Sequence, residues 1–141
     1  MKVLIDTNVI LDVLCKRKQF YENSLNIFRL CEIKKVEGYI SSLSVANIIY
    51  IMRKELDNNL INILIKNLFS IFNIIDLTSL DLIKATEINC NDYEDALQII
   101  EASRLKVDYI ITRNTKDFLK SKVVAITPKD FLEELFTSNR N

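Results

Sequence analysis

The sequence predicts an α/β domain of three layers, in which helices cover both faces of a central parallel sheet of about five strands. Two observations carry this prediction. Short, continuous apolar runs alternate with longer stretches of helical periodicity, and the 141 residues, 49% of them hydrophobic, suffice for one domain with a buried core. Because strands that helices bury on both faces are apolar throughout, these runs favour a parallel sheet.

The elements follow one another in a regular order. Five apolar, mostly β-branched runs predict the strands, at residues 3–5, 38–41, 73–77, 108–112 and 123–126. Apolar residues at helical spacing predict helices at residues 9–14, 20–36, 45–56, 60–72, 80–88 and 93–105. The second strand begins at Gly38, the only glycine, and Ser79 is expected to cap the fifth helix. Thr127 is expected to cap a last helix that begins at Pro128.

We expect one domain over residues 1–137 and a polar, frayed tail over residues 138–141, since no linker or internal repeat divides the chain. The apolar run before Asp6 is too short for a signal peptide. Polar residues interrupt the most apolar window, residues 60–77, so it falls short of the roughly 20 apolar residues of a membrane span. The sequence therefore predicts a soluble cytoplasmic protein with no membrane segment.

The composition excludes several kinds of catalysis. With no histidine, the chain has no Ser-His-Asp or Cys-His machinery and no His-ligated zinc. One glycine cannot build a Gly-rich phosphate loop. The three cysteines (Cys15, Cys31, Cys90) lack CxxC spacing and are expected to be small buried hydrophobes in a reducing compartment. The 19 basic residues balance 19 acidic ones, which leaves a local basic patch as the only electrostatic route to nucleic acid.

Three carboxylates are expected at one edge of the sheet. Asp6 follows the first strand, Asp117 follows the fourth, and Asp95 lies just inside the helix over residues 93–105. Taken singly, Asp6 also fits a helix cap and Asp117 an ordinary first-turn acid. Because sites form beyond the carboxyl ends of parallel strands, the three together favour a hard, oxygen-seeking cation such as Mg²⁺ or Mn²⁺, as in metal-dependent nucleases.

Other polar residues accompany these acids. Asn8 is expected to organise the loop after the first strand. Asp92 and Glu94 either cap the helix over 93–105 and complement its dipole, or help Asp95 to bind a cation. Asn114 or Thr115 is expected to cap a short helix that contains Phe118.

Three segments resemble the PIN domain, the family that includes the VapC-type toxin ribonucleases of bacterial toxin–antitoxin systems. The resemblance is carried by residues 3–12, by Asp95-Ala96-Leu97 with Ala102 on the same helical face, and by residues 111–118. It covers nearly the whole chain, with matched segments towards both ends.

This resemblance implies a three-layer α/β/α domain and a metal-dependent endoribonuclease. In that role Asp6, Asp95 and Asp117 would bind Mg²⁺ or Mn²⁺, together with a mid-chain glutamate. An activated water would attack an RNA phosphodiester, and Thr112 and Asn8 would hold the geometry of the site.

The sequence departs from the family at the position of that glutamate, where Asn47 stands. Asparagine still offers a carbonyl oxygen but removes one negative charge, so metal affinity should fall and a second metal becomes doubtful. Two interpretations stay open. Either Glu94 or Asp92 supplies the missing charge, or Asn47 is hydrogen-bonded to Asp6 or Asn8 in an inactive site.

Basic residues near the predicted edge are candidates for RNA contact. Arg113 and Lys116 are the main ones, with Lys120 and Lys122 beside them. Residues 16–18 (Lys-Arg-Lys) either flank the entrance or form an ordinary solvated surface, and Asp12 is expected to cap or pair on the surface. The apolar helices over 45–72 offer either a homodimer interface or a groove for an antitoxin.

Two functional hypotheses follow. The first is a toxin-like PIN ribonuclease that uses one bound Mg²⁺ or Mn²⁺. The alternative is a catalytically weakened PIN-like module that binds RNA or a protein partner without cleaving.

Overall fold

The computed structural model describes residues 1–139 and confirms the predicted α/β class. Five strands form one sheet in the order β3-β2-β1-β4-β5, and every neighbouring pair is parallel. The strands are β1 (Lys2–Ile5), β2 (Glu37–Ser41), β3 (Asn73–Ile75), β4 (Tyr109–Ile111) and β5 (Val124–Ile126). All five carboxyl ends therefore lie at one edge of the sheet.

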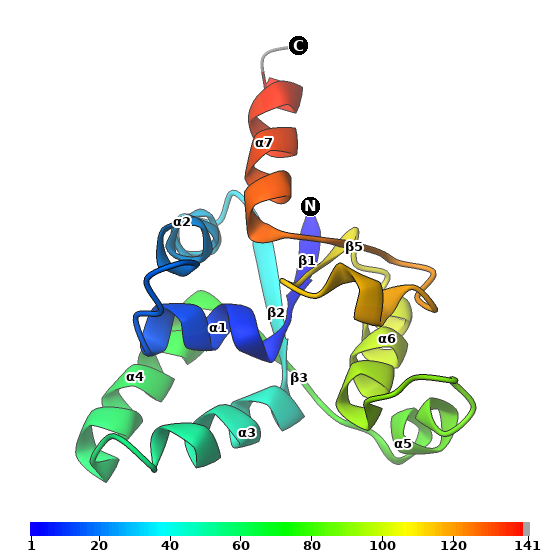
Figure 1. Cartoon of the computed structure of the whole chain (residues 1–141), viewed down its shortest axis with the longest axis horizontal. Coiled ribbons are helices and arrows are strands. Elements are labelled where there is room, and N and C mark those ends of the chain that lie inside the picture. Colours follow the sequence, from blue (N-terminus) through cyan, green and yellow to red (C-terminus); the bar gives the residue numbers. More distant parts are fainter. Residues whose placement is uncertain (140–141) are drawn as a thin grey trace.

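Helices cover both faces of this sheet (Figure 1). One face packs against α1 (Thr7–Leu14), α2 (Tyr21–Glu32), α3 (Ser42–Met52), α4 (Asn58–Ile71) and α7 (Pro128–Asn139). The other packs against α6 (Tyr93–Leu105) and the short 3₁₀ helix η1 (Thr115–Phe118), with α5 (Ser79–Ala85) against α6. Among residues 1–139, no helix is long and apolar enough to cross a membrane.

The central strand β1 shows why its sequence is apolar throughout. Val3 and Ile5 point into the core on the side of α1–α4, and Leu4 points into the core on the side of α6. All three side chains are fully buried. Because neighbours hold β1 on both faces and both edges, the residue that follows it is placed rigidly.

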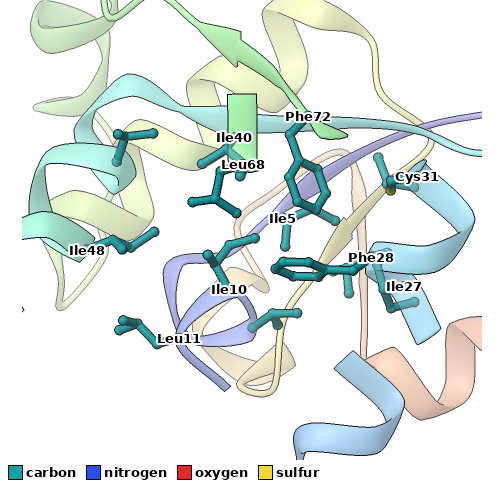
Figure 2. Close-up of a cluster of buried hydrophobic side chains, with 14 of the residues drawn as sticks. Ile5, Ile10, Leu11, Ile27, Phe28, Cys31, Ile40, Ile48, Leu68 and Phe72 are labelled. Carbon is teal, nitrogen blue, oxygen red and sulfur yellow. The ribbon is translucent and has the colours of Figure 1, made fainter. Parts of the chain in front are cut away.

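The larger core requires the only glycine of the chain. Phe28 of α2 and Phe72 meet edge to face, with ring centroids 4.9 Å apart (Figure 2). A Cβ atom on Gly38 would lie 2.7 Å from both Phe72 Cδ1 and Cys31 Sγ. Cys31 is buried as predicted, and burial raises the pKa of its thiol to about 12. Cys15 and Cys90 are only partly buried, so the same prediction was wrong for them.

Several helix ends differ from the prediction. α2 ends at Glu32 rather than at residue 36, and Lys34 beyond it has a positive φ of 62°. Thr78, not Ser79, caps α5: its Oγ1 accepts a hydrogen bond from the Asp81 backbone N–H, and the Asp81 carboxylate accepts one from the Thr78 N–H. The polar tail expected at 138–141 begins inside α7, which is helical to residue 139, and residues 140–141 lie outside the described part.

Glu101 is a buried acid between α6 and the sheet. Its carboxylate is fully buried and accepts a 2.8 Å hydrogen bond from Ser41 Oγ, while Oε2 has no partner among the described residues. Desolvation raises its pKa to about 7. The folded protein therefore keeps a proton on Glu101 at pH values where the unfolded chain has lost it.

We expect Glu101→Gln to remove a pH-dependent loss of stability. Because the folded pKa lies above the ordinary 4.5, wild-type stability falls as pH rises from about 4.5 to 7 and stays lower above that. The amide oxygen still accepts from Ser41 and carries no charge. The variant should therefore gain about 3 kcal/mol at pH 8, which is several degrees in Tm, and almost nothing at pH 4.

Thermal denaturation at pH 4, 6 and 8 measures this difference. Glu133→Gln, an exposed acid on α7, is the matched control and should show no such trend. An equal shift of Glu101→Gln at all three pH values would contradict the assignment of a buried, protonated Glu101.

Candidate active site

Asp6 is fixed where the carboxyl ends of β1 and β4 meet. Its backbone N–H donates to the Ile111 carbonyl at 3.0 Å. Its carboxylate is buried and accepts from Thr112 Oγ1 at 2.8 Å and from Gln98 Nε2 at 3.0 Å. Asp6 occupies the N-cap position of α1 but makes no side-chain cap, so its carboxylate belongs to the sheet edge and not to the helix.

Glu94, in the first turn of α6, is held by two other helices. Asn47 Nδ2 of α3 donates to Glu94 Oε2 at 2.9 Å, and Thr7 Oγ1 of α1 donates to Oε1 at 2.7 Å. The Ser44 hydroxyl lies 2.8 Å from Thr7 Oγ1, and it donates there because the single Thr7 proton faces the carboxylate. Of the two interpretations of Asn47, the hydrogen bond to Asp6 or Asn8 was wrong, since the partner of Asn47 is Glu94.

The other two acids at the start of α6, Asp92 at the N-cap and Asp95 in the first turn, have different roles. Asp92 caps the helix as predicted, because its Oδ1 accepts from the backbone N–H groups of Glu94 and Asp95 at 2.8 and 3.3 Å. Asp95 is half-buried, and its pKa is raised to about 7. Desolvation is the largest cause, followed by the charges of Asp92, Asp6, Asp117 and Glu94. The fold therefore brings four other carboxylates close enough to Asp95 to contribute to its raised pKa.

These acids line two adjacent hollows at the carboxyl edge of the sheet. Asp6, Asn8 and Asn47 line the first, together with Glu94. Asp117 lines the second, and so do Lys116, Lys120 and Cys90. Asp92 and Asp95 line both hollows. Of the three predicted metal ligands, Asp6 thus lines the first hollow, Asp117 lines the second, and Asp95 lines both.

The donor chemistry of the first hollow fits a hard divalent cation. Its candidate ligands are carboxylate, amide and hydroxyl oxygens, which Mg²⁺ and Mn²⁺ prefer. Desolvation first, and the neighbouring carboxylates second, raise the pKa of Asp95, and a bound cation would offset both. Within residues 1–139, no three acidic or cysteine side chains lie close enough to enclose an ion. Coordination therefore needs rotation of side chains or bridging water.

Thr112 connects Asp6 to the segment that follows β4. Thr112 is fully buried, and its Oγ1 also accepts from the Asn114 backbone N–H at 3.1 Å. The predicted short helix containing Phe118 is present as η1. Asn114 stands at its N-cap position but makes no side-chain cap there, so that part of the prediction was wrong.

Arg113 faces away from the acids and towards α1 and α2. Its Nε lies 2.9 Å from Asp12 Oδ2, and its guanidinium stacks 4.0 Å from the centre of the Phe20 ring. Arg17 lies 3.5 Å from the other Asp12 oxygen. Asp12 therefore pairs, as one of its two expected roles had it, but it is fully buried, so the expected surface position was wrong. By contrast, Lys116 and Lys120 are exposed beside Asp117.

The sequence did not single out Thr7 or Gln98. Gln98 is buried within the apolar run of α6 and donates to Asp6, so a polar residue on a buried helical face was the signal that could have identified it. In the sequence, Thr7 could not be distinguished from the other capping residues after β1, because its hydrogen bond to Glu94 joins residues that are 87 positions apart.

Comparisons with known proteins identify the family of the chain. The chain is 28% identical over 137 residues to ribonuclease VapC1 of Aquifex aeolicus (strain VF5), covering 94% of each protein. Two solved structures share the fold at 21% identity, each matched over 90% of this chain and 98% of its own: VapBC2 from Rickettsia felis bound to a promoter DNA fragment (TM-score 0.67) and FitAcB from Neisseria gonorrhoeae (TM-score 0.69). The sequence profile of the PIN domain matches residues 2–116. The chain therefore belongs to the PIN domain family.

Proposed function

We propose that this protein is a metal-dependent endoribonuclease of the VapC toxin type. The observation that carries the proposal is the group of five carboxylates at the carboxyl edge of the sheet, Asp95 and the four acids around it. The similarity to ribonuclease VapC1 supports RNA as the substrate class. A site of oxygen ligands alone needs neither an imidazole nor a Gly-rich loop, which agrees with the composition of the chain.

In this function, Asp6, Asp95 and Asp117 would hold one Mg²⁺ or Mn²⁺ ion, directly or through bridging water. When bound, the ion supplies an activated water and neutralises charge on the phosphoryl oxygens. Thr112 and Gln98 orient the Asp6 carboxylate by their hydrogen bonds.

Lys116 and Lys120 are the groups best placed to hold the RNA backbone. Both are exposed in the hollow that also contains Asp117. A strand lying along the two hollows passes Asp95, which lines both of them. Lysine ammonium groups bind phosphates without reading sequence, so these residues position the strand. Arg113 is a weaker candidate than the sequence suggested, because Asp12 and Phe20 already engage its guanidinium.

We further propose an antitoxin partner and a homodimer. Apolar side chains on α3 and α4 are exposed, including Tyr50 at 67%, Ile63 at 58% and Phe69 at 52%. Exposed apolar surface of this kind is typical of protein interfaces. The Rickettsia felis neighbour is a VapBC complex, which supports an antitoxin as one of the partners.

The alternative, a PIN module that binds without cleaving, is favoured by one observation. The carboxylates of the described residues do not enclose an ion as they stand. This alternative predicts no measurable metal binding, and RNA affinity that is unchanged when Asp6 is replaced.

We expect Asp6→Asn and Asp95→Asn each to reduce RNA cleavage by about 100-fold or more, since each removes a carboxylate ligand of the metal. Loss of a residue that only hydrogen-bonds to a metal ligand already lowers metal affinity or activity by about 10–100-fold. Cleavage of a panel of structured RNAs by the purified chain, with Mg²⁺ or Mn²⁺, measures this effect. Glu133→Gln should cleave like the wild type. Absence of wild-type cleavage with either metal, together with unchanged RNA binding by Asp6→Asn, would favour the non-cleaving module.

Lys116→Gln and Arg113→Gln should separate RNA binding from stability. Lys116→Gln should weaken RNA binding several-fold at low salt and lower the salt slope by about one, with Tm unchanged. Arg113→Gln leaves the fully buried Asp12 without its nearest partner, so it should lose roughly 3 kcal/mol of stability.

Fluorescence anisotropy with single-stranded RNA in EDTA, together with thermal denaturation, measures both effects. Lys129→Gln, an exposed lysine at the start of α7, is the control for the loss of one positive charge. If Arg113→Gln weakened RNA binding at an unchanged Tm, Arg113 would be an RNA contact after all.

A further inference from the structure

The contact between Asn47 and Glu94 joins two helices at the wall of the first hollow. An acid in the first turn of a helix is favoured by the dipole while its side chain stays in solvent. Glu94 does not stay there: one carboxylate oxygen accepts from Asn47 and the other from Thr7. Fixing this flexible side chain loses conformational entropy. The two hydrogen bonds therefore fix the carboxylate of Glu94 in one position at the wall of the first hollow.

That place is electrostatically unfavourable for a carboxylate. Glu94 shares the hollow with Asp6, Asp92 and Asp95. Both of its partners are neutral, so neither compensates the charge. Among residues 1–139, no lysine or arginine forms an ion pair with Glu94. A charge held rigidly among like charges by neutral donors calls for a cation from outside the chain.

The hydrogen bonds leave Glu94 able to bind that cation. A carboxylate oxygen carries two lone pairs, and each oxygen of Glu94 uses one of them to accept from Asn47 or Thr7. One lone pair on each oxygen stays available. Ligating carboxylates are commonly oriented by such outer hydrogen bonds.

We propose that Glu94 is a ligand of the divalent cation and that Asn47 is the residue that positions it. This inference rests on the proposed function, because it concerns the same ion. Asn47 is then not a vestige of a lost ligand: its amide orients a carboxylate that reaches the site from α6 instead of from α3. The carboxylate of Glu94 and the amide of Asn47 thus act together, the first as the ligand and the second as the group that orients it.

Exchanging the two groups tests this arrangement. Glu94→Gln keeps the size and a hydrogen-bonding group but removes the charge, so Mn²⁺ affinity should fall about 10-fold or more. Asn47→Glu sets two carboxylates face to face, so it should lower Tm without metal and regain the loss when Mn²⁺ is added. The double variant Asn47→Glu/Glu94→Gln reverses the hydrogen bond and restores the charge. Its Mn²⁺ affinity should return to within about 3-fold of the wild type.

Isothermal titration calorimetry with Mn²⁺ alone measures these affinities, and thermal denaturation shows whether each variant is folded. Glu133→Gln, which loses the same charge on an exposed part of α7, should bind Mn²⁺ like the wild type. Asp6→Asn reports on the proposed function separately, since it should lose Mn²⁺ binding whatever Glu94 does.

Three results would overturn the inference. If Asp6→Asn loses Mn²⁺ binding and Glu94→Gln does not, the metal site stands and Glu94 only bridges helices. If Glu94→Gln loses binding and the double variant fails to recover it, positions 47 and 94 are not interchangeable. If the wild type binds no Mn²⁺, both the inference and the metal-dependent function fail.

Discussion

The junction of Asp6 with the end of β4 determines the rest of this site. Its backbone continues the pairing of β1 with β4 by one residue, through the Ile111 carbonyl. Its carboxylate then binds Thr112 beyond β4 and Gln98 on α6. Because β1 is the central strand and its residues 3–5 are fully buried, none of these partners can shift alone. The first turn of α6, with its acids, is thereby held against the carboxyl ends of both strands.

The buried acids of this protein are accommodated in three different ways. Asp12 and Asp81 are paired with arginines, and Arg104 reaches both oxygens of Asp81. Within the described part of the chain Glu101 has no such partner, and desolvation raises its pKa to about 7, so it keeps a proton below that pH. Asp6 follows neither route: both donors to its carboxylate are neutral. Among residues 1–139, the site therefore gathers acidic side chains whose compensation must come from outside the described part of the chain.

The local features of the fold could be predicted from the sequence, and long-range contacts could not. Continuous apolar runs indicate strands buried on both faces, and the end of such a run at Asp6 places an acid at the sheet edge. No local pattern shows that Asn47 meets Glu94, or that Asp12 turns inward to Arg113. A side chain next to a strand end can face either side of the edge, and only packing decides which. Arg113 stood beside the strand end, as predicted, and packing turned it away from the acids.

The chain is neutral overall, but acidic and basic side chains are separated at the site, and this separation affects how RNA would bind. Four carboxylates lie around Asp95, and the nearby exposed cations are Lys116 and Lys120. A phosphate backbone approaching this edge meets a net negative field unless the acids are compensated. In a PIN ribonuclease built this way, a divalent ion and RNA must therefore favour one another's binding, and by linkage the coupling is reciprocal. This coupling grows with every carboxylate that faces the ion. By orienting Glu94, Asn47 would therefore affect the binding of RNA as well as the binding of the metal.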